Sequence, residues 1–489
     1  MSIARIMSRR SLLAGAGCVA VGATLVPRAL RAAGAADEIR LTAAPGRAAI
    51  AGSDHPETAI WCYNAALPGP DIRLRQDERL RVAVENRLKQ DTTIHWHGLR
   101  VPNAMDGVPD LTQPSIAPGA SFVYEFPVQD AGTYWYHPHA HSAEQVGRGL
   151  AGALIVEEAE PLPVDRDVAW VLGDWRLKED ASIAGGFDNP MEMSMAGRIG
   201  NTVTINGRVP DRFSVRNGER VRLRLINAAP ARIFGLVFKS HSPLVIALDG
   251  QPIEPHAPEG GRIVLGPAMR VDLVLDMRGE PGTISPVIDS FYEGLVYKLV
   301  DLSYTDEPPV RTQPLAAPAK LPSNTIPEPD VAKARRHVVT LTGGMMGGMG
   351  MGGNGMSEMM GNGGMMGNGG MRGMMGGGSM WAINGVAVPG DDMAHMKPIL
   401  TLDRDKSYVL AIDNQTAWYH PIHLHGHSFR VTTRNGKPTK YREWRDTVLI
   451  PPRERAEIAF VADNPGDWMF HCHILDHQER GMMSVIRVT

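Results

Sequence analysis

The sequence of 489 residues predicts an all-β fold made of three related β-sandwich or barrel domains. Short runs of β-branched and apolar residues alternate with turns rich in Gly, Pro, Asn and Asp, as in ERLRVAVEN and RAEIAFVA, and long helical periodicities are scarce. One pattern occurs three times, because ERLRVAVENRL, ERVRLRLINAA and KSYVLAIDNQT each have the form of a strand that ends in Asn before a turn. Repetition of this kind marks repeated structural units, so we expect domains at 37–158, 159–305 and 336–489.

The first 36 residues have the composition of a targeting signal rather than of a folded domain. Arg9 and Arg10 precede a short apolar stretch, small residues follow in RAAGAADE, and no acidic residue occurs before Asp37. Paired arginines followed by two leucines resemble a twin-arginine signal, and a plain basic leader of the general secretory route is the alternative. We expect residues 1–36 to direct export of the folded protein to the periplasm.

The bulk composition excludes several classes of partner. The net charge is −3, no basic surface suited to nucleic acid is evident, and no apolar run is long enough for a membrane helix. We therefore expect no nucleic-acid partner and no membrane partner. The assembly state expected is a monomer, although no sequence feature specifies it. Of three cysteines, Cys18 leaves with the leader and Cys62 has the character of a small buried apolar residue. Cys472 lies between two histidines, which predicts a ligand thiol rather than a disulfide.

Two segments of unusual composition flank the start of the third domain. Residues 306–335 are rich in proline and predict a linker. Residues 343–380 consist almost entirely of glycine and methionine and hold 13 of the 26 methionines. Glycine explains flexibility but not the enrichment in thioethers, which are soft ligands suited to Cu(I). A low-complexity loop that merely tolerates methionine is the alternative. The candidate Cu(I) ligands are Met345, Met346, Met349, Met351, Met356, Met359, Met360, Met365, Met366, Met371, Met374, Met375 and Met380.

Four short motifs hold most of the histidines, two in the first expected domain and two in the last. They are HWHG (His95, His97), HPH (His137, His139), HPIHLHGH (His420, His423, His425) and HCHILDHQERGM (His471, Cys472, His473, His477, Met482). Residues i and i+2 of a strand point to one face, about 6–7 Å apart, so each His-x-His pair can contact two neighbouring metal ions. We expect the metal site to bridge the first and third domains.

The ligand types indicate copper. His420, Cys472 and His477, with Met482 as a weak axial thioether, form the set typical of a blue-copper electron-transfer site. The other eight motif histidines suit a cluster of three coppers with open positions. In HCH, strand alternation sends Cys472 to one face and both flanking histidines to the other, so one short strand joins the two sites.

These four motifs, in this order, resemble those of the multicopper oxidases. The resemblance covers nearly the whole chain after the leader, and it implies three cupredoxin-like Greek-key domains and four copper ions, one type 1, one type 2 and two type 3. It also implies that O₂ is reduced to water with electrons from a reducing substrate. It assigns His95 and His423 to the type 2 copper, His97, His137 and His473 to one type 3 copper, and His139, His425 and His471 to the other.

The methionine segment favours Cu(I) as substrate, because it resembles the methionine-rich insertions of periplasmic cuprous oxidases. Those insertions also carry acids and histidines, whereas Glu358 is the only acid between residues 345 and 380 here. A laccase-like oxidase of phenols and aromatic amines is the alternative enzyme. A non-enzymatic cupredoxin-fold copper-binding protein is the alternative of another class, but its relatives lack copper ligands that this chain has.

Two acids are candidates for proton delivery during O₂ reduction. Asp106, in NAMDGVPD, lies where the family has such an acid, although an Asp before Gly is also common in turns. Related oxidases often carry a second acid directly after the last type 1 histidine. This chain has Gln478 there, so Glu479 is the candidate to replace it.

Overall fold

The computed structural model describes residues 30–31, 38–313, 315–318, 320–345, 380–388 and 396–489. Within these residues, six β-sheets form three pairs, and the α-helices are three short ones: α1 (Ser142–Gly147), α2 (Pro190–Met193) and α5 (Leu475–Glu479). The all-β class predicted from the sequence is therefore confirmed. None of the described helices is long and apolar enough to span a membrane.

The first pair of sheets uses strands between residues 30 and 157. Its five-stranded sheet has the order β1 (Leu30–Arg31), β4 (Gly69–Arg75), β9 (Gly152–Glu157), β8 (Gly132–His137) and β6 (His95–His97). Its four-stranded sheet has the order β3 (Thr58–Tyr63), β2 (Ile39–Ala48), β5 (Arg79–Asn86) and β7 (Ser121–Pro127). Alternating residues of both sheets, such as Leu41, Val82 and Leu154, fill one core between them.

The middle pair uses strands between residues 166 and 304. Its six-stranded sheet has the order β11 (Thr202–Ile205), β10 (Arg166–Trp175), β13 (Arg220–Asn227), β18 (Arg270–Asp276), β15 (Leu244–Leu248) and β16 (Gln251–His256). Its five-stranded sheet has the order β12 (Arg212–Val215), β20 (Tyr297–Tyr304), β19 (Ile284–Asp289), β14 (Phe234–Phe238) and β17 (Ile263–Leu265). A second core, including Leu223, Leu236 and Leu273, lies between these sheets.

The third pair uses strands between residues 335 and 488. Its larger sheet has the order β22 (Trp381–Ile383), β21 (Arg335–Gly343), β24 (Ser407–Asn414), β30 (Arg455–Val461), β26 (Phe429–Arg434) and β27 (Lys437–Pro438), with β28 (Trp444–Arg445) paired to β26. Its five-stranded sheet has the order β23 (Leu400–Leu402), β32 (Met483–Val488), β31 (Gly466–Cys472), β25 (His420–Leu424) and β29 (Thr447–Ile450). The third core contains Leu341, Val431 and Phe470.

The repeated Asn closes the same kind of turn in all three sheet pairs. Asn86, Asn227 and Asn414 end β5, β13 and β24 and are almost completely buried. Each side-chain oxygen accepts from the backbone N–H two residues later. Each side-chain amide donates to backbone carbonyls of neighbouring loops. The turn thereby satisfies buried backbone groups that no strand partner reaches.

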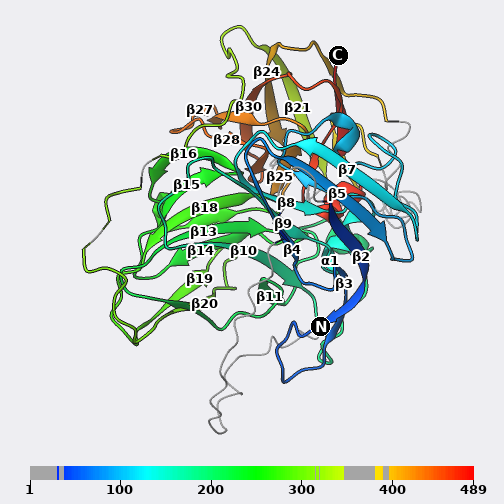
Figure 1. Ribbon diagram of the computed structural model, residues 1–489. Coiled ribbons are helices and arrows are strands. Elements are labelled where there is room, and N and C mark those ends of the chain that lie inside the picture. The colour runs from blue at the N-terminus through cyan, green and yellow to red at the C-terminus, as the bar shows by residue number, and fades with distance from the viewer. Residues whose placement is uncertain (1–29, 32–37, 314, 319, 346–379, 389–395) are drawn as a thin grey trace, which may run out of the picture.

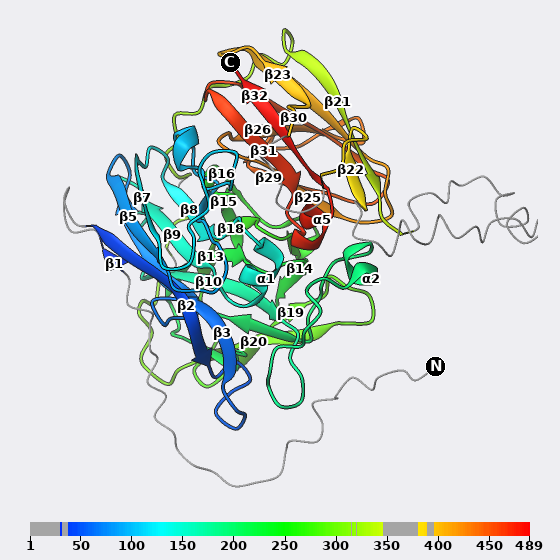
Figure 2. The same cartoon turned by 90° about the vertical axis from the view of Figure 1, so that its right-hand side faces the viewer.

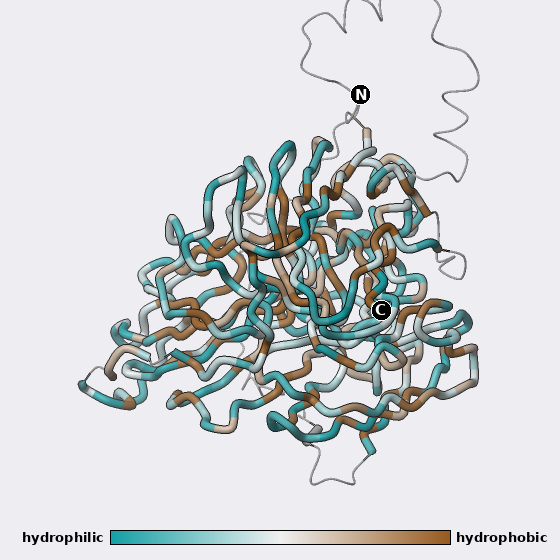
Figure 3. Tube along the Cα trace, turned by 90° about the horizontal axis from the view of Figure 1, so that it is seen from above, coloured by the Kyte–Doolittle hydropathy of each residue, from teal (hydrophilic) through white to brown (hydrophobic). Residues whose placement is uncertain are grey.

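The three sheet pairs pack against one another, with the third pair above the other two in Figures 1 and 2. A small cluster of apolar side chains joins the first pair to the middle pair, including Trp135, Ala169 and Ile226. Figure 3 shows apolar stretches along the inner strands and polar stretches in the outer loops. Strands β6 and β8 of the first pair lie beside β25 and β31 of the third, because His95 of β6 contacts His423 of β25 and His137 of β8 contacts His473 just after β31.

Three sequence predictions concern segments with little described structure. The predicted leader lies outside the described residues except for Leu30 and Arg31, which pair with β4. The predicted linker, 306–335, lies between β20 and β21, and its described residues form no strand before Arg335. Of the thirteen candidate methionines, Met345 and Met380 are described and the other eleven lie outside the described residues. The domain boundaries and the leader stay predictions.

Candidate metal centre

Two histidines and a cysteine form one cluster of possible metal ligands at the end of β31. His420 begins β25, Cys472 ends β31, and His477 lies in α5. Cys472 Sγ lies 3.4 Å from His420 Nδ1 and 3.6 Å from His477 Nδ1, and the two Nδ1 atoms are 3.2 Å apart. Met482 is buried in the same core, and its carbonyl accepts from the Cys472 N–H at 3.0 Å. The four residues predicted for a blue-copper site are therefore neighbours.

A hydrogen bond holds the far nitrogen of each of these histidines and turns Nδ1 toward the thiol. His477 Nε2 donates to the Met195 carbonyl at 2.8 Å, so its Nδ1 presents a lone pair. His420 Nε2 lies 2.7 Å from Thr416 Oγ1, which in turn lies 2.8 Å from Asn414 Oδ1. Because Asn414 Oδ1 can only accept, the Thr416 hydroxyl donates to it and accepts from His420.

The indole of Trp381 covers both histidines. Its ring centroid lies 4.1 Å from that of His477 and 5.2 Å from that of His420, and its Nε1 donates to the Met193 carbonyl at 2.7 Å. Burial lowers the pKa of His477 to about 3 and raises the pKa of the Cys472 thiol. The imidazoles are therefore neutral ligands at ordinary pH, whereas the thiol would give up its proton on binding a metal ion.

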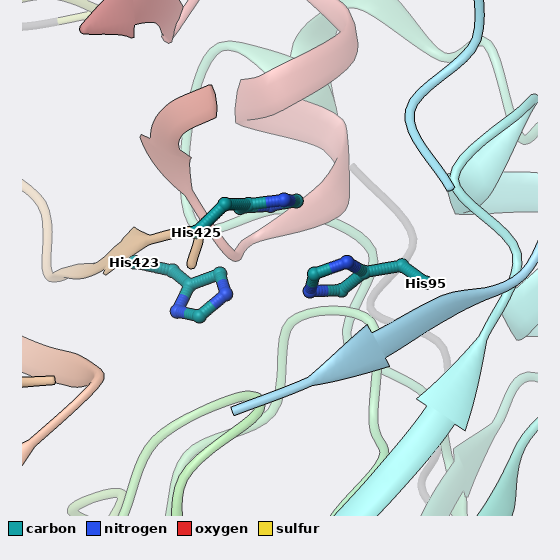
Figure 4. Close-up of side chains that lie close together, drawn as sticks. All are labelled: His95, His423 and His425. Atoms are coloured by element: carbon teal, nitrogen blue, oxygen red, sulfur yellow. The ribbon is translucent and has the colours of Figure 1, made fainter. Parts of the chain in front are cut away.

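Eight further histidines meet between the first and third sheet pairs. On β6 and β8, His95 lies opposite His137 in register, and on β25 and β31, His423 lies opposite His471. The strands and the loops that follow them supply His95, His97, His137, His139, His423, His425, His471 and His473, none more than 2% exposed. Figure 4 shows His95 approaching from β6 and His423 and His425 from β25 and the residue after it, with their rings turned toward one another.

The ring nitrogens of these histidines approach closely enough to share metal ions. Three groups have ligand atoms within 4.8 Å of one another: His95 with His423 and His425; His95 with His97 and His137; and His139 with His425 and His471. These groups share members, so a single continuous cluster is formed.

His425 and His471 show most directly that the cluster is built for cations. His425 Nδ1 donates to Asp106 Oδ2 at 2.8 Å, and His471 Nδ1 donates to the Cys472 carbonyl at 2.9 Å. Neutral imidazole carries one N–H, so both Nε2 atoms hold lone pairs. They nevertheless lie only 3.0 Å apart in a buried site. Two facing lone pairs repel unless a cation lies against both, so these residues fit a metal ion.

The same orientation holds for His95 and His423. His95 Nδ1 donates to the Asp106 carbonyl and His423 Nδ1 to the Asp446 carbonyl, both at 2.8 Å. The Nε2 atoms of both, and that of His139, are buried and have no hydrogen-bond partner in the described residues. A buried polar atom without a partner is rare in native proteins, and here a metal ligand role explains it.

His97 has the opposite orientation. Its Nε2 lies 3.1 Å from Asp446 Oδ1 and 3.1 Å from Thr447 Oγ1, and its buried Nδ1 has no partner in the described residues. A carboxylate only accepts, so Nε2 carries the proton and Nδ1 is the free donor atom. His97 would therefore bind a metal ion through Nδ1, whereas His95 and His423 would bind through Nε2.

Cys472 connects the two clusters through the backbone. Its side chain belongs to the first cluster, while His471 and His473 on either side of it belong to the second. This confirms the strand alternation expected for HCH. Only peptide and side-chain bonds of adjacent residues separate a thiolate ligand from imidazole ligands of the neighbouring cluster.

The two predicted acids lie in different surroundings. Asp106 is fully buried, and its Oδ1 lies 3.3 Å from His95 Nδ1 while its Oδ2 accepts from His425. Glu479 is half-buried, and its Oε1 accepts from the Ala143 N–H in the first turn of α1. Gln478 is buried and donates to a serine hydroxyl of α1 at 3.2 Å. The structure brings Asp106 into contact with the histidine cluster and places Glu479 at the neighbouring helix.

The ends of the methionine segment lie at the first cluster. Met345 donates from its backbone N to the Ser194 carbonyl at 2.7 Å and accepts from the Trp418 indole at 3.0 Å. Met380 donates to the Arg480 carbonyl at 2.8 Å and directly precedes Trp381. Both ends of the segment are thus fixed beside the histidine and thiol ligands.

Several residues at the site were not identified from the sequence. Met195 and Trp381 lie in no His or Cys motif, and Met195 comes from the middle sheet pair. Thr416 follows Asn414, the third of the repeated asparagines, by two residues. The repeat therefore predicts the turn that contains Thr416, but it does not predict the contact of Thr416 with His420. Asp446 orients a histidine of the cluster, since its Oδ1 lies 3.1 Å from His97 Nε2.

A thiol with two histidines beside an eight-histidine cluster, on paired β-sheets, defines a copper-binding oxidoreductase of the cupredoxin type. Family models described as multicopper oxidase match residues 46–161, 166–283 and 373–489. The multicopper oxidase MmcO of Mycobacterium tuberculosis is 30% identical over 474 residues, covering 90% of this chain and 85% of that protein. The chain belongs to the multicopper oxidase family, so it is an oxidase that binds copper and couples substrate oxidation to O₂.

Further comparisons in sequence and in structure give similar proteins. Copper resistance protein A of Escherichia coli is 25% identical over 563 residues, which cover 90% of each chain. A multi-copper oxidase from Pseudomonas thermotolerans superposes with a TM-score of 0.79 and 34% identity, over 94% of this chain and 100% of that one. The laccase-like CueO of Ochrobactrum sp. superposes with a TM-score of 0.77 and 27% identity, over 95% and 99%. The predicted cupredoxin-like fold is thereby confirmed.

Proposed function

We propose that this multicopper oxidase is a cuprous oxidase, which oxidises Cu(I) and reduces O₂ to water with four bound copper ions. The single observation that carries the copper cluster is the 3.0 Å approach of two unprotonated Nε2 atoms in a buried site. The type 1 ligands would be His420, Cys472, His477 and Met482. By motif position, the type 2 ligands would be His95 and His423, and the type 3 ligands His97, His137 and His473 for one ion and His139, His425 and His471 for the other. The last three also form one of the close groups described above.

Bound copper would supply one-electron steps, so that four Cu(I) ions deliver the four electrons that, with four protons, convert O₂ to two waters. The chain supplies the route between the two sites. His477 lies on the side of the thiol that faces α2 and Trp381, so electrons would enter there. From the copper at the thiol site, electrons would pass through Cys472 to His471 and His473, to which Cys472 is joined by peptide bonds.

The same residues exclude water and orient the ligands. Every histidine of the proposed cluster is buried, so no solvent competes for its free nitrogen. Asp106 would hold His425 in position and supply protons next to the cluster, since its Oδ1 has no hydrogen-bond partner in the described residues. Glu479 would provide a second proton source one residue beyond Gln478, which occupies the place where related oxidases often have an acid.

Cu(I) is favoured as substrate by chemistry and by position. The methionine segment offers soft thioether ligands, and its ends, Met345 and Met380, are fixed beside His477. The His477 Nε2 atom is occupied by the Met195 carbonyl and its ring is covered by Trp381. A phenol ring cannot contact that nitrogen directly, whereas Cu(I) bound by thioethers of the segment would not need to.

Export and assembly state complete the proposal. The twin-arginine-type leader would place the enzyme in the periplasm, where excess Cu(I) is encountered before it reaches the cytoplasm. Copper resistance protein A, one of the relatives above, has a name that agrees with this role. We propose a monomer, because all ligands of both copper sites come from one chain.

The test distinguishes Cu(I) binding by the thioethers from steric shielding of the type 1 site by the segment. One variant replaces the eleven methionines between residues 346 and 379 by Leu, which keeps apolar side chains and chain length but removes the thioethers. A second variant replaces the whole stretch 346–379 by a Gly/Ser linker of the same length. Oxygen uptake is measured with Cu(I) and with a dimethoxyphenol at matched copper loading.

We expect both variants to raise the KM for Cu(I), by about tenfold if many weak sites serve to raise the local concentration. Oxidation of the phenol should be unchanged in the Leu variant and unchanged or faster with the linker. An unaltered KM for Cu(I) in the Leu variant would refute the capture role and favour the laccase-like alternative. That alternative is consistent with the activity on lignin model compounds stated for the Ochrobactrum enzyme.

A further inference from the structure

Arg270 of the middle sheet pair reaches the histidine cluster, although the middle pair carries none of the histidine motifs. It begins β18 and is completely buried. Its Nη1 donates to Asp446 Oδ1 at 2.8 Å and its Nη2 to Asp446 Oδ2 at 2.5 Å. Its Nε donates to the Thr133 carbonyl, and its backbone N donates to Asp249 Oδ1. Hydrogen bonds thus fix both the guanidinium group and the backbone of Arg270.

This ion pair determines what Asp446 can do for His97. Both carboxylate oxygens accept from Arg270, so the carboxylate has one orientation. In that orientation Oδ1 lies 3.1 Å from His97 Nε2 and accepts from the Thr447 hydroxyl at 2.8 Å. His97 must then carry its proton on Nε2 and keep Nδ1 free. Its tautomer and ring orientation therefore depend on Asp446.

A second histidine depends on the same residue through the backbone. The carbonyl of Asp446 accepts from His423 Nδ1 at 2.8 Å, and the rings of His423 and His97 stack with centroids 3.8 Å apart. A shift of Asp446 would move both rings together. Arg270 therefore acts on two histidines that the family pattern assigns to different copper ions.

The residue after His97 has to be glycine for this contact to form. Gly98 has a φ of +89°, which L side chains rarely adopt. A Cβ at Gly98 would lie 2.2 Å from Arg270 Nη2 and 2.6 Å from Asp446 Oδ2. The first, middle and third sheet pairs thus meet at one point, with Gly98, Arg270 and Asp446 as their contributions.

We infer that Arg270 is a positioning residue for the oxygen-reducing site and that the middle sheet pair is part of that site rather than a spacer alone. This inference rests on the proposed copper cluster. Arg270 presents two parallel N–H groups to a carboxylate, which a lysine ammonium cannot do. Loss of the pair frees Asp446, so that His97 and His423 lose their fixed orientation while the thiol site is left intact.

The experiment compares Arg270→Lys and Arg270→Met with a matched control. Arg220 is itself buried and forms a two-point ion pair with the half-buried Asp276 in the same sheet, at 2.6 and 2.9 Å, and in the described residues it contacts no copper ligand. Arg220→Met therefore removes a similar pair without touching the site. Each protein is measured for copper content after dialysis against a chelator, for the blue absorption, for the type 2 electron paramagnetic resonance signal and for thermal unfolding.

We expect both Arg270 variants to bind the cluster coppers 10–100-fold more weakly, with an altered type 2 signal, while the blue absorption persists. Arg220→Met should retain all copper even if its unfolding temperature falls. Cluster copper held as tightly in Arg270→Lys as in the parent protein would overturn the inference. Equal loss of blue absorption and cluster copper would also overturn it, because that pattern indicates general unfolding. A parent protein without cluster copper would instead refute the proposed function.

Discussion

Replacing Thr416 by Val should weaken the thiol site by removing the acceptor that orients His420. The Thr416 oxygen accepts from His420 Nε2 at 2.7 Å and from the Trp418 backbone N–H at 3.1 Å. Thr416 is fully buried, so both donors would be left without a partner. Each such loss costs about 1–3 kcal/mol, and Trp418 is half-buried and lies at the lower end, so the total is about 2–4 kcal/mol.

The cost divides between folding and copper binding. Val has nearly the shape of Thr, so the surrounding core keeps its packing and the lost hydrogen bonds are the main change. Without its partner, His420 can rotate, and loss of a residue that orients a metal ligand typically reduces metal affinity 10–100-fold. We therefore expect the blue absorption of the Val variant to disappear at a lower chelator concentration than that of the parent protein.

Thr432→Val is the matched control. Thr432 is also buried, lies on β26 of the same sheet pair, and donates to the Glu457 carbonyl at 3.2 Å. Its removal should cost about 1 kcal/mol and leave the blue absorption unchanged. If Thr416→Val and Thr432→Val release copper from the thiol site at the same chelator concentration, the Thr416 hydroxyl does not orient His420. Thermal unfolding of both variants shows whether the loss lies in folding alone.

Three further changes test the other proposed roles. Cys472→Ser should abolish the blue absorption and the oxidase activity while most of the cluster copper remains, and a persisting blue band would contradict the type 1 assignment. Asp106→Asn should leave reduction of the blue site intact but slow its reoxidation by O₂ about 100-fold in stopped-flow traces. Unchanged reoxidation would show that Asp106 has a structural role in its turn and does not deliver protons. Glu479→Gln keeps an acceptor for the Ala143 N–H, so stability should hold while reoxidation slows. Equal reoxidation rates would show that Glu479 does not deliver protons.

The fold class could be predicted because strand alternation and turn chemistry are local properties. The repeated Asn is the clearest case, since Asn86, Asn227 and Asn414 each close a turn with their own neighbouring backbone groups. The sheet order could not be predicted in the same way. β4 pairs in parallel with β9, about 80 residues later, and nothing in either strand specifies that partner.

The same distinction applies to the metal site. The copper-ligand histidines stand in motifs whose spacing of two matches one face of a strand, so their grouping was evident in the sequence. Met195, Trp381 and Arg270 contact the site from segments that have no ligand pattern. Met195 and Arg270 belong to the middle part of the chain and contact residues 282 and 176 positions away, so their roles depend on how the sheet pairs dock. Trp381 lies on β22 of the third pair, and its contact with His477 depends on how that pair folds. None of these contacts leaves a local signal.

Because the cluster forms only where the first and third sheet pairs meet, removal of copper should loosen that interface before the separate cores unfold. His95 and His97 come from one side and His423 and His471 from the other, and copper would bind nitrogens of both sides, such as His95 Nε2 and His423 Nε2, that have no hydrogen-bond partner in the described residues. At free copper a thousand times its Kd, one site stabilises the folded state by about 4 kcal/mol. Copper-free protein should therefore show a lower unfolding temperature and faster amide hydrogen exchange in β6 and β25 than in β13 of the middle core. Uniform acceleration in all three strands, or none, would show that copper does not join the two sheet pairs.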